Sequence, residues 1–343
     1  MTSPAVSPSG PQSESLPQVA ETLKHPAFAG TIWKLEPHSK GRCPVAKGRG
    51  GPLQIAYELH GDGPIRVAFI MGLAGVKTSW QQQTKYFGHD LGDKYTVLIL
   101  DNRGIGQSDK PWRRYTTSAM ALDAIEVLEH VGWLDPPYSS SSTSSAPADS
   151  SPAAAAATAS RAFHLVGISM GGMISQEIAY RIPTRLASLS LICTAAVVEN
   201  TKSCTPRCGR ASTPAQDGAY LPFDSNFQRF QAQELVKKLN PATYTAWGFA
   251  LQLGAAMVHN KSQAQLSEIA DKLGRERILI IHGDADEMID VSLGKKLIDM
   301  VKPGTSQIIP GMGHAPIMDR GPWLNELLET HIAAGEKIKE SQG

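Results

Sequence analysis

Cysteines and long apolar runs are scarce in this sequence, and each shortage excludes a class of protein. Four cysteines in 343 residues are too few for the disulfide framework that holds small secreted domains together. Apolar runs such as residues 97–100 and 278–281 have the length of a strand, whereas a membrane-spanning helix needs roughly 20 apolar residues. The sequence therefore predicts a globular chain with no membrane span.

An excess of charge of either sign is also lacking. The 33 Lys and Arg residues and the 32 Asp and Glu residues give a formal net charge of +1. Nucleic acids and anionic membrane surfaces are bound through basic patches, so neither is an expected partner. Residues 1–20 have neither the basic start nor the apolar stretch of a secretory signal. We expect a cytoplasmic protein.

No group of cysteines has the spacing of a metal site. Cys43 and Cys193 are isolated in the sequence, and only Cys204 and Cys208 lie close together. A structural zinc ion needs four ligands, and nothing nearby supplies a second pair. The sequence predicts free thiols, no metal and no cofactor.

The order of apolar segments predicts the fold class. Strand-like runs at residues 32–35, 53–59 and 67–71 are followed, after Gly75, by alternating helical and strand-like segments. This alternation is typical of an α/β protein with a mostly parallel, doubly wound sheet.

Composition divides the chain into a core and three further segments. Residues 1–30 are rich in Pro, Ser and Gln and predict a disordered tail, and residues 138–160 form a low-complexity insertion rich in Ser and Ala. Residues 197–274 interrupt the alternation and predict a helical lid. The core is then left with residues 31–196 and 275–343.

Part of the predicted lid, residues 244–257, is strongly apolar. Trp247 and Leu251 belong to an apolar stripe in this segment. Such a stripe is more often plain core than a substrate wall, although a lid can use it for both. We name both residues as candidate substrate-binding residues and keep core packing as the alternative.

The segment FHLVGISMGGM at residues 163–173 reads as a buried strand, an abrupt turn and the start of a helix. The turn contains a G-x-S-x-G string, whose glycines let the strand swing into the helix so that the Ser169 oxygen projects from the tip. Strained turns of this kind collect at active sites. The string alone is a weak signal, but the strand and helix lie where the motif requires them. Ser169 is the candidate nucleophile.

A serine hydroxyl needs a base to take its proton and a carboxylate to orient that base. Asp286 follows a predicted strand in the run HGDADEMI, and His314 follows the last predicted strand in the run GMGH. Residues just past the carboxyl ends of neighbouring parallel strands converge on one crevice. Ser169, Asp286 and His314 are therefore the candidate triad. His282 and His164 lie within strands and are expected to be packed core residues.

Four motifs together resemble those of the α/β-hydrolase superfamily, in particular a serine-nucleophile, esterase- or lipase-like member with a helical lid. They are the elbow, the run DNRGIGQSD at residues 101–109, a Gly-x-x-Asp and a Gly-x-Gly-His, in the family's order. The resemblance implies the α/β-hydrolase fold from about residue 50 to 335. It also implies an oxyanion hole made by the backbone N–H groups of Leu73 and Met170. The Gly-x-x-Asp spacing favours Asp286 over Asp284, and Asp290 is a weaker alternative.

The sequence departs from the family at Met71-Gly72, where His-Gly is common. Because the oxyanion donors are backbone amides, activity can survive this exchange. Met71 should make the pocket entrance less polar, and it is a third candidate substrate-binding residue. We expect Arg103 and Ser108 to brace loops near the site rather than take part in the reaction.

The resemblance and the candidate residues predict a serine hydrolase. Its substrate would be a small apolar molecule with an ester, or an amide, lactone or carbon–carbon bond, cleaved through an acyl-enzyme under a mobile lid. A serine at position 169 counts against haloalkane dehalogenases and epoxide hydrolases, which use an aspartate. Acyl transfer to an alcohol or thiol would use the same residues, and a ligand-binding protein can keep the fold without turnover. Both alternatives stay open, as do the substrate and the oligomeric state.

Overall fold

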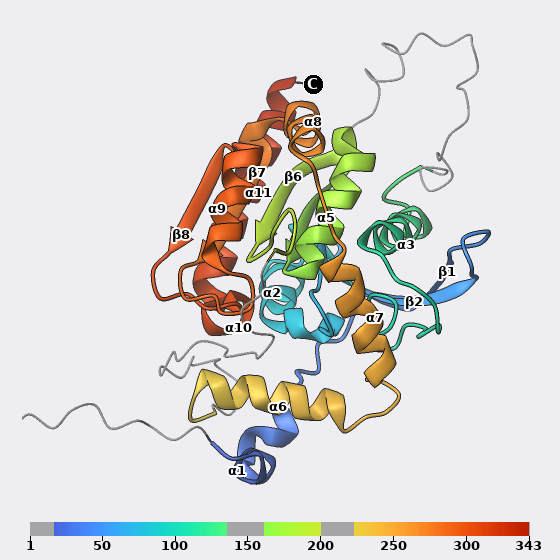
Figure 1. Cartoon of the computed structure of the whole chain (residues 1–343), viewed down its shortest axis with the longest axis vertical. Coiled ribbons are helices and arrows are strands. Elements are labelled where there is room, and N and C mark those ends of the chain that lie inside the picture. The colour runs from blue at the N-terminus through green and yellow to red at the C-terminus, as the bar shows by residue number, and fades with distance from the viewer. Residues whose placement is uncertain (1–16, 136–160, 200–222, 343) are drawn as a thin grey trace, which may run out of the picture.

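The computed structural model describes residues 17–135, 161–199 and 223–342. Within them, eight strands form one sheet in the order β1-β2-β4-β3-β5-β6-β7-β8 (Figure 1). β2 runs antiparallel to β1 and β4, and the other neighbours are parallel. The strands are β1 (Ser39–Val45), β2 (Leu53–His60), β3 (Ile65–Ile70), β4 (Tyr95–Leu100), β5 (Phe163–Ile168), β6 (Leu186–Ile192), β7 (Ile278–Gly283) and β8 (Thr305–Ile309).

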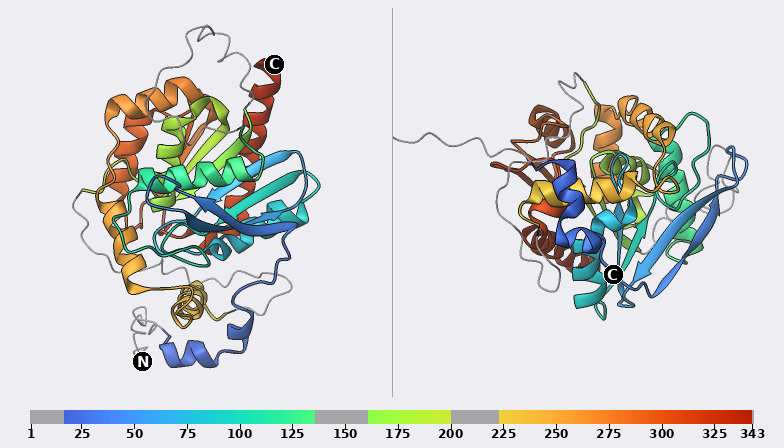
Figure 2. Two further views of the ribbon diagram at one scale, coloured as in Figure 1. Left: turned by 90° about the vertical axis from the view of Figure 1, so that its right-hand side faces the viewer. Right: turned by 90° about the horizontal axis from the view of Figure 1, so that it is seen from below.

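Helices cover both faces of this sheet, which confirms the predicted doubly wound α/β architecture (Figures 1 and 2). One apolar core joins the sheet to α3, α5, α8 and α9, and a second joins its other face to η2, η3, α10 and α11. The α-helices are α1 (Val19–Lys24), α2 (Gln81–Lys85), α3 (Thr117–His130), α5 (Met170–Arg181), α6 (Asn226–Lys238), α7 (Ala246–Met257), α8 (Gln263–Leu273), α9 (Val291–Val301), α10 (Pro316–Asp319) and α11 (Gly321–Gln342). Short 3-10 or π turns are η1 (Pro26–Gly30), η2 (Lys77–Trp80), η3 (Tyr86–Asp90), η4 (Pro183–Arg185) and η5 (Arg275–Arg277).

The central strands explain why the site can be built at one end of the sheet. Every residue of β5, β6 and β7 is buried, as their aliphatic sequences require for strands covered on both faces. All three strands run in the same direction. β8 is parallel to β7 as well. The carboxyl ends of these strands therefore open at the same edge of the sheet, where Ser169, Asp286 and His314 follow β5, β7 and β8.

The N-terminal part of the chain differs from the prediction. Residues 32–35 form no strand, because the backbone N–H of Trp33 donates to the Gln81 side chain (3.0 Å) instead of joining a sheet. The expected tail at residues 1–30 is helical in its described part, where α1 and η1 occur. α1 packs on α6, and the buried Thr22 hydroxyl donates a hydrogen bond to the Gln231 side chain. Composition alone could not reveal this long-range contact.

The predicted lid is divided between two parts of the molecule. α6 and α7 lie at one end of the body, with α1 against α6 (Figures 1 and 2). α8 instead packs on α5 and α9 as part of the helical layer, so the predicted boundary at residue 274 lies too far along the chain. We call residues 223–257, which contain α6 and α7, the cap. The low-complexity insertion and the Cys204–Cys208 pair lie outside the described residues.

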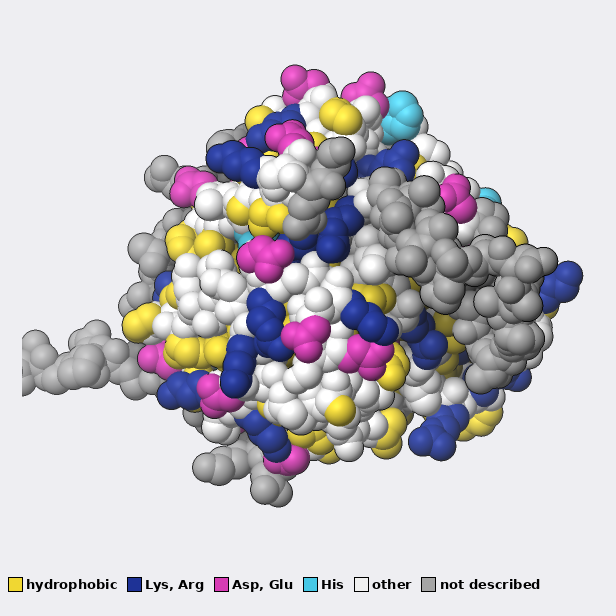
Figure 3. Space-filling model, turned by 90° about the horizontal axis from the view of Figure 1, so that it is seen from above, with side chains coloured by type: hydrophobic (Ala, Val, Ile, Leu, Met, Phe, Trp, Pro, Cys, Tyr) yellow, Lys and Arg dark blue, Asp and Glu magenta, His cyan; other side chains and the backbone are white. Residues whose placement is uncertain are grey.

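No helix in the described parts of the chain has the length and apolarity to cross a bilayer. On the face shown in Figure 3, Lys and Arg side chains are interspersed with Asp and Glu side chains. The near balance of charge in the sequence is thus also visible locally on this face.

Candidate functional site

Ser169 occupies a sharp corner between β5 and α5. Its φ of 56° and ψ of −127° place a non-glycine residue in a backbone region that costs free energy and is rare outside functional sites. The corner leaves no room for side chains: a Cβ on Gly171 would lie 2.1 Å from the Ile70 carbonyl oxygen, and one on Gly167 would lie 2.3 Å from Ser175 Oγ. The two glycines of the motif are therefore required by close backbone approach.

Neighbouring backbone groups hold this corner in place. The Ser169 N–H donates to the Ile192 carbonyl at the end of β6 (2.9 Å), and its own carbonyl accepts from Thr194 Oγ1 (2.7 Å) and from the Gly172 N–H (2.9 Å). The strained conformation is thus fixed by hydrogen bonds on both sides of the serine.

Asp286 and His314 form a buried pair. His314 Nδ1 lies 2.7 Å from Asp286 Oδ2, and Asp286 Oδ1 accepts the backbone N–H groups of Met288 and Ile289 at 2.9 Å each. Burial alone raises the pKa of Asp286, but the charge and hydrogen bond of His314, with His282 and the Ile289 N–H, outweigh burial and leave this pKa below its usual value. An ionised carboxylate only accepts, so Nδ1 carries the proton and Nε2 is left as the acceptor.

The pair lies beside the serine corner. Cys193, the residue after Ile192, has its Sγ within 4.8 Å of ligand atoms of both Asp286 and His314. Since the Ser169 N–H bonds Ile192, the ends of β5, β6 and β7 bring the three candidate residues to one region. The sequence indicates only that Cys193 is an isolated thiol, and its φ of 45° is a property that the sequence does not reveal.

Cys193, Asp286 and His314 offer three donor atoms of kinds that bind metals. Two of these donors, His314 Nδ1 and Asp286 Oδ2, already share a hydrogen bond. A tetrahedral zinc site would need them to separate and would need a further ligand. The geometry therefore suits an Asp–His pair better than a metal centre.

The rival acids have other roles. Asp284 is exposed and accepts the Gly311 N–H at 2.7 Å, which fixes the turn that leads to His314. Asp290 caps α9 by accepting the Ser292 N–H at 2.9 Å.

The rival histidines are packed in the interior. His282 Nε2 lies 2.8 Å from the Ile289 carbonyl and 3.4 Å from Asp286 Oδ2, and burial lowers its pKa. His164 bonds the side chains of Ser188 (2.8 Å) and Glu336 (3.1 Å). Both therefore occupy the core positions that the sequence indicated.

Residues 71–75 form a turn that lies against the serine, and we call them the oxyanion loop. The Gly75 N–H bonds the Gly72 carbonyl at 3.2 Å, and a Cβ on Gly72 would lie 2.9 Å from Ser169 Cβ and 3.4 Å from its Oγ. Among the described residues, no acceptor is assigned to the N–H of Leu73 or of Met170. Both amides therefore remain candidates for the oxyanion hole that the resemblance implies.

The three candidate substrate-binding residues do not share one location. Met71 is half-buried and packs against Gly75, and Leu251 is half-buried against the larger core. Trp247 is 43% exposed and lies beside Trp112 on the outer surface, with its indole N–H 3.3 Å from the Lys110 carbonyl. Trp247 thus lies at the surface, which the sequence could not indicate, because helical spacing fixes the face of a residue only relative to its own helix.

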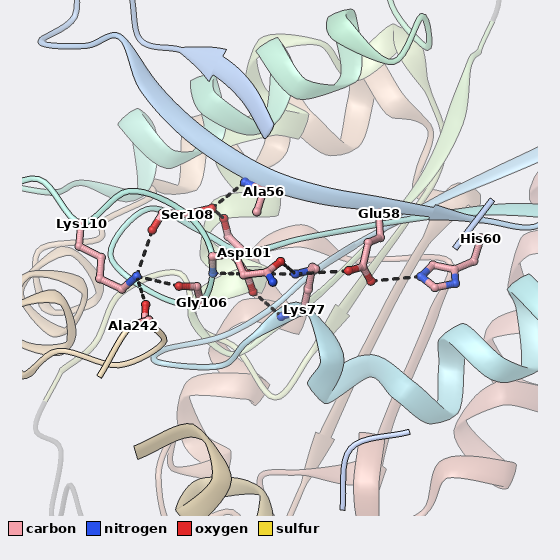
Figure 4. A network of polar contacts seen from close by, with 10 residues as sticks. Ala56, Glu58, His60, Lys77, Asp101, Gly106, Ser108, Lys110 and Ala242 are labelled. Atoms are coloured by element: carbon pink, nitrogen blue, oxygen red, sulfur yellow. Dashed lines mark hydrogen bonds and ion pairs between the residues drawn. The ribbon is translucent and has the colours of Figure 1, made fainter. Parts of the chain in front are cut away.

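The loop at residues 101–109 braces the site (Figure 4). Asp101 accepts the Lys77 backbone N–H (2.7 Å), Lys77 Nζ (3.2 Å) and the Gln107 N–H (2.9 Å). Ser108 Oγ donates to the Asp101 carbonyl (2.6 Å) and accepts the Ala56 N–H (2.9 Å). These contacts agree with a bracing role for the motif.

Arg103 and Asn102 extend the same bracing. Buried Arg103 forms two bonds of 2.5 Å to Asp123 on α3. Asn102 Nδ2 donates to the Met71 carbonyl at 2.9 Å, which ties the 101–109 loop to the start of the oxyanion loop. None of these contacts brings the Arg103 or Asn102 side chain to Ser169.

Two cap residues that the sequence analysis missed also contact the oxyanion loop. Lys237 on α6 donates to the Ala74 carbonyl at 2.8 Å, and Gln252 on α7 accepts the Ala74 N–H at 2.8 Å. Neither residue belongs to a motif, and each lies more than 160 positions from Ala74 in the sequence. No local signal could have identified them.

The sequence matches a family model described as the alpha/beta hydrolase family over residues 59–327. It is 29% identical over 174 residues to the monoacylglycerol lipase abhd6-A of Xenopus laevis, an alignment that covers 47% of this chain and 51% of the lipase. The chain thus spans about half the length of this lipase. It is also 27% identical over 237 residues to the 3-oxoadipate enol-lactonase 2 of Acinetobacter baylyi, covering 67% and 74% of the two chains.

Solved structures resemble the fold over most of the chain. An esterase from Thermogutta terrifontis superposes with a TM-score of 0.57 at 18% identity, covering 87% of this chain and 99% of that one. A carboxylesterase structure from Nitrososphaera gargenis has a TM-score of 0.61 at 15% identity, with 87% and 99% coverage. At these identities the similarity shows the shared fold.

Proposed function

This chain belongs to the alpha/beta hydrolase family, and from that premise we propose that it is a serine hydrolase acting on esters of small apolar acyl groups. The observation that carries the proposal is the 2.7 Å pair of His314 and Asp286 at the end of the sheet where Ser169 sits in its strained corner. A nucleophile, a base and an orienting carboxylate in this arrangement are what acyl transfer through a serine requires.

In the proposed reaction, His314 Nε2 takes the proton of Ser169 Oγ while that oxygen attacks the ester carbonyl carbon. Asp286 keeps the proton on Nδ1 and stabilises the imidazolium that forms. The N–H groups of Leu73 and Met170 stabilise the oxyanion. The imidazolium then protonates the departing alcohol, and water, activated by the same imidazole, releases the acid and restores the serine.

The proposed substrate class is supported by the names of the relatives and by apolar side chains of the oxyanion loop and the cap. Relatives of the chain are named for cleaving a monoacylglycerol ester and an enol-lactone, and both are carboxylic esters. Met71 and Leu251 present apolar surface near the oxyanion loop and the cap. These features support an ester with an apolar acyl chain over a charged substrate.

Acyl transfer is the second candidate, because a further relative is the dihydrolipoyllysine-residue acetyltransferase component of an acetoin cleaving system from Pseudomonas putida, 28% identical over 84% of this chain. In that case an alcohol or thiol would replace water in the second half of the reaction. Hydrolysis requires no further substrate site and is the proposal we favour.

The test is ester hydrolysis by the purified protein, measured with p-nitrophenyl esters of increasing acyl length. We expect turnover that depends on chain length and is lost in Ser169→Ala with the melting temperature retained, since the serine packs little. Turnover that rises when a thiol or alcohol is added, with a transacylated product, would favour acyl transfer. A folded Ser169→Ala protein that hydrolyses as fast as the wild type would end the proposal.

A further inference from the structure

Ala74 is the strained residue of the oxyanion loop. Its φ of 54° lies in the left-handed region, where a residue with a Cβ pays a free energy of about 1 kcal/mol. It directly follows Leu73, one of the two proposed oxyanion donors. The Leu73 N–H belongs to the Gly72–Leu73 peptide, and the Ala74 N–H belongs to the next peptide. Whatever holds the Leu73–Ala74 peptide in place therefore restrains Leu73 and, through its backbone torsions, the direction of the Leu73 N–H.

Both backbone polar groups of Ala74 are held by side chains of the cap. Gln252 Oε1 accepts the N–H at 2.8 Å, and Lys237 Nζ donates to the carbonyl at 2.8 Å. Gln252 is fully buried and Lys237 nearly so. Hydrogen bonds in such surroundings are stronger and more directional than those at an exposed surface.

Each side chain is itself fixed by a further contact. Gln252 Nε2 donates to the Arg103 carbonyl at 2.8 Å, and Lys237 Nζ also pairs with Glu234 on the same helix. Gln252 thereby links the oxyanion loop to the braced loop at residues 101–109. The clamp on Ala74 is a connected arrangement rather than two isolated bonds.

We propose that Lys237 and Gln252 are positioning residues for the oxyanion hole, so that the cap, and not the core alone, sets the geometry of the reacting site. This inference rests on the proposed serine-hydrolase function. While both bonds are made, Ala74 is clamped and the Leu73 amide is aimed at the oxyanion; when either bond is lost, the loop is released and this donor loses its alignment.

The cap is also anchored at a place that does not touch the oxyanion loop, which provides a control. Lys110 Nζ donates to the carbonyls of Gly106 (2.7 Å), Ser108 (3.1 Å) and Ala242 (2.7 Å), so it holds the segment between α6 and α7 to the core (Figure 4). Removing this anchor loosens the cap without removing either bond to Ala74.

The experiment compares Lys237→Met and Gln252→Met with Lys110→Met and Lys238→Met. Lys238 neighbours Lys237, but its side chain is 54% exposed and pairs only loosely with Glu234 at 3.6 Å. Steady-state kcat and KM with one p-nitrophenyl ester, the rate of labelling by a fluorophosphonate and the melting temperature are measured for each. Lys237→Arg, which keeps a donor, tests for rescue.

For Lys237→Met and Gln252→Met we expect kcat and the labelling rate to fall together by roughly 10- to 100-fold, the scale of an ångström-sized misplacement, with KM nearly unchanged. Lys237→Arg should recover part of the loss, and Lys238→Met should match the wild type. Lys110→Met should alter KM more than kcat.

The inference is overturned if Lys237→Met retains the wild-type kcat, or if Lys110→Met loses as much kcat as Lys237→Met, because cap docking would then explain the effect. If Lys237→Met fails to fold, the split between kcat and KM in Gln252→Met decides. Absence of both hydrolysis and labelling in the wild-type protein would instead refute the proposed function itself.

Discussion

The corner that carries Ser169 and the cap that contacts the neighbouring oxyanion loop differ in how far backbone and side-chain contacts hold them. The corner is fixed mainly by backbone groups, such as the bond from the Ser169 N–H to Ile192, and by glycines that leave no space for a Cβ. The cap is attached by the backbone bond from the Gly106 N–H to the Thr243 carbonyl and by single side chains, including Lys110, Lys237 and Gln252. The reacting atoms thus depend on local geometry, whereas the fit of the cap depends on long-range partners.

The largest expected effect is on catalysis, and it distinguishes the two aspartates that follow β7, Asp286 and Asp284. Asp286→Asn should lower kcat/KM by roughly ten-thousand-fold, as in other Ser-His-Asp triads, because an amide cannot orient and stabilise the His314 imidazolium. Asp284→Asn should cost far less, since Asp284 bonds only the turn that leads to His314. The measurement is ester hydrolysis by the two variants. If Asp284→Asn loses most of its activity while Asp286→Asn stays active, Asp284 and not Asp286 is the acid of the triad.

The next prediction tests whether the cap also depends on backbone contact at α7. A Cβ on Gly248 would lie 2.2 Å from the Gly104 carbonyl oxygen, while a Cβ on Gly254 would meet nothing within 4 Å. Gly248→Ala should therefore destabilise the protein by about 1–3 kcal/mol and raise KM. Gly254→Ala should stabilise it by up to about 1 kcal/mol, the usual gain in a helix.

Chemical denaturation and ester hydrolysis of these two alanine variants check this pair. Equal stabilities would show that α7 can move away from Gly104 without cost, so that this backbone contact does not hold the cap.

The smallest expected effect is on stability and concerns Asp319 in α10, just after the His314 turn. Burial raises the pKa of Asp319 to about 6, above the value near 3.9 of an unfolded chain. The folded state therefore binds this proton more tightly than the unfolded chain does. The contribution of protonated Asp319 to the free energy of unfolding is fully present below about pH 4 and is lost as the pH rises through 6.

Asp319→Asn should consequently raise the melting temperature by a few degrees at pH 7.5 and leave it nearly unchanged at pH 4. Asp93→Asn, at an exposed position, is the matched control and should shift neither value. An equal gain at both pH values for Asp319→Asn would show that the effect has another origin than the buried charge.

The same contrast explains which features the sequence could predict. The Ser169 corner, the Asp286 and His314 turns and the parallel sheet are encoded by short patterns of glycine, charge and apolar periodicity, from which the sequence predicts them. β5 to β7 are buried along their whole length, and their aliphatic runs predicted this. Local spacing was sufficient wherever the constraint itself was local.

The features that escaped prediction depend on contacts between distant segments. α1 exists where a tail was expected because it packs on α6, and Trp247 faces the surface because α7 presents another face to the core. The contacts of Lys237 and Gln252 with Ala74 span 163 and 178 positions. Periodicity cannot reveal such partners, since it defines faces without saying what covers them.

The most direct measurement of the central claim is the site of covalent modification by a fluorophosphonate, read by peptide mass spectrometry. The account predicts one adduct, on Ser169, formed by the wild-type protein and greatly slowed in His314→Ala. Asp284→Asn should be labelled at nearly the wild-type rate. An adduct on another residue, or labelling of Ser169 at an unchanged rate in His314→Ala, would contradict the proposed nucleophile and base.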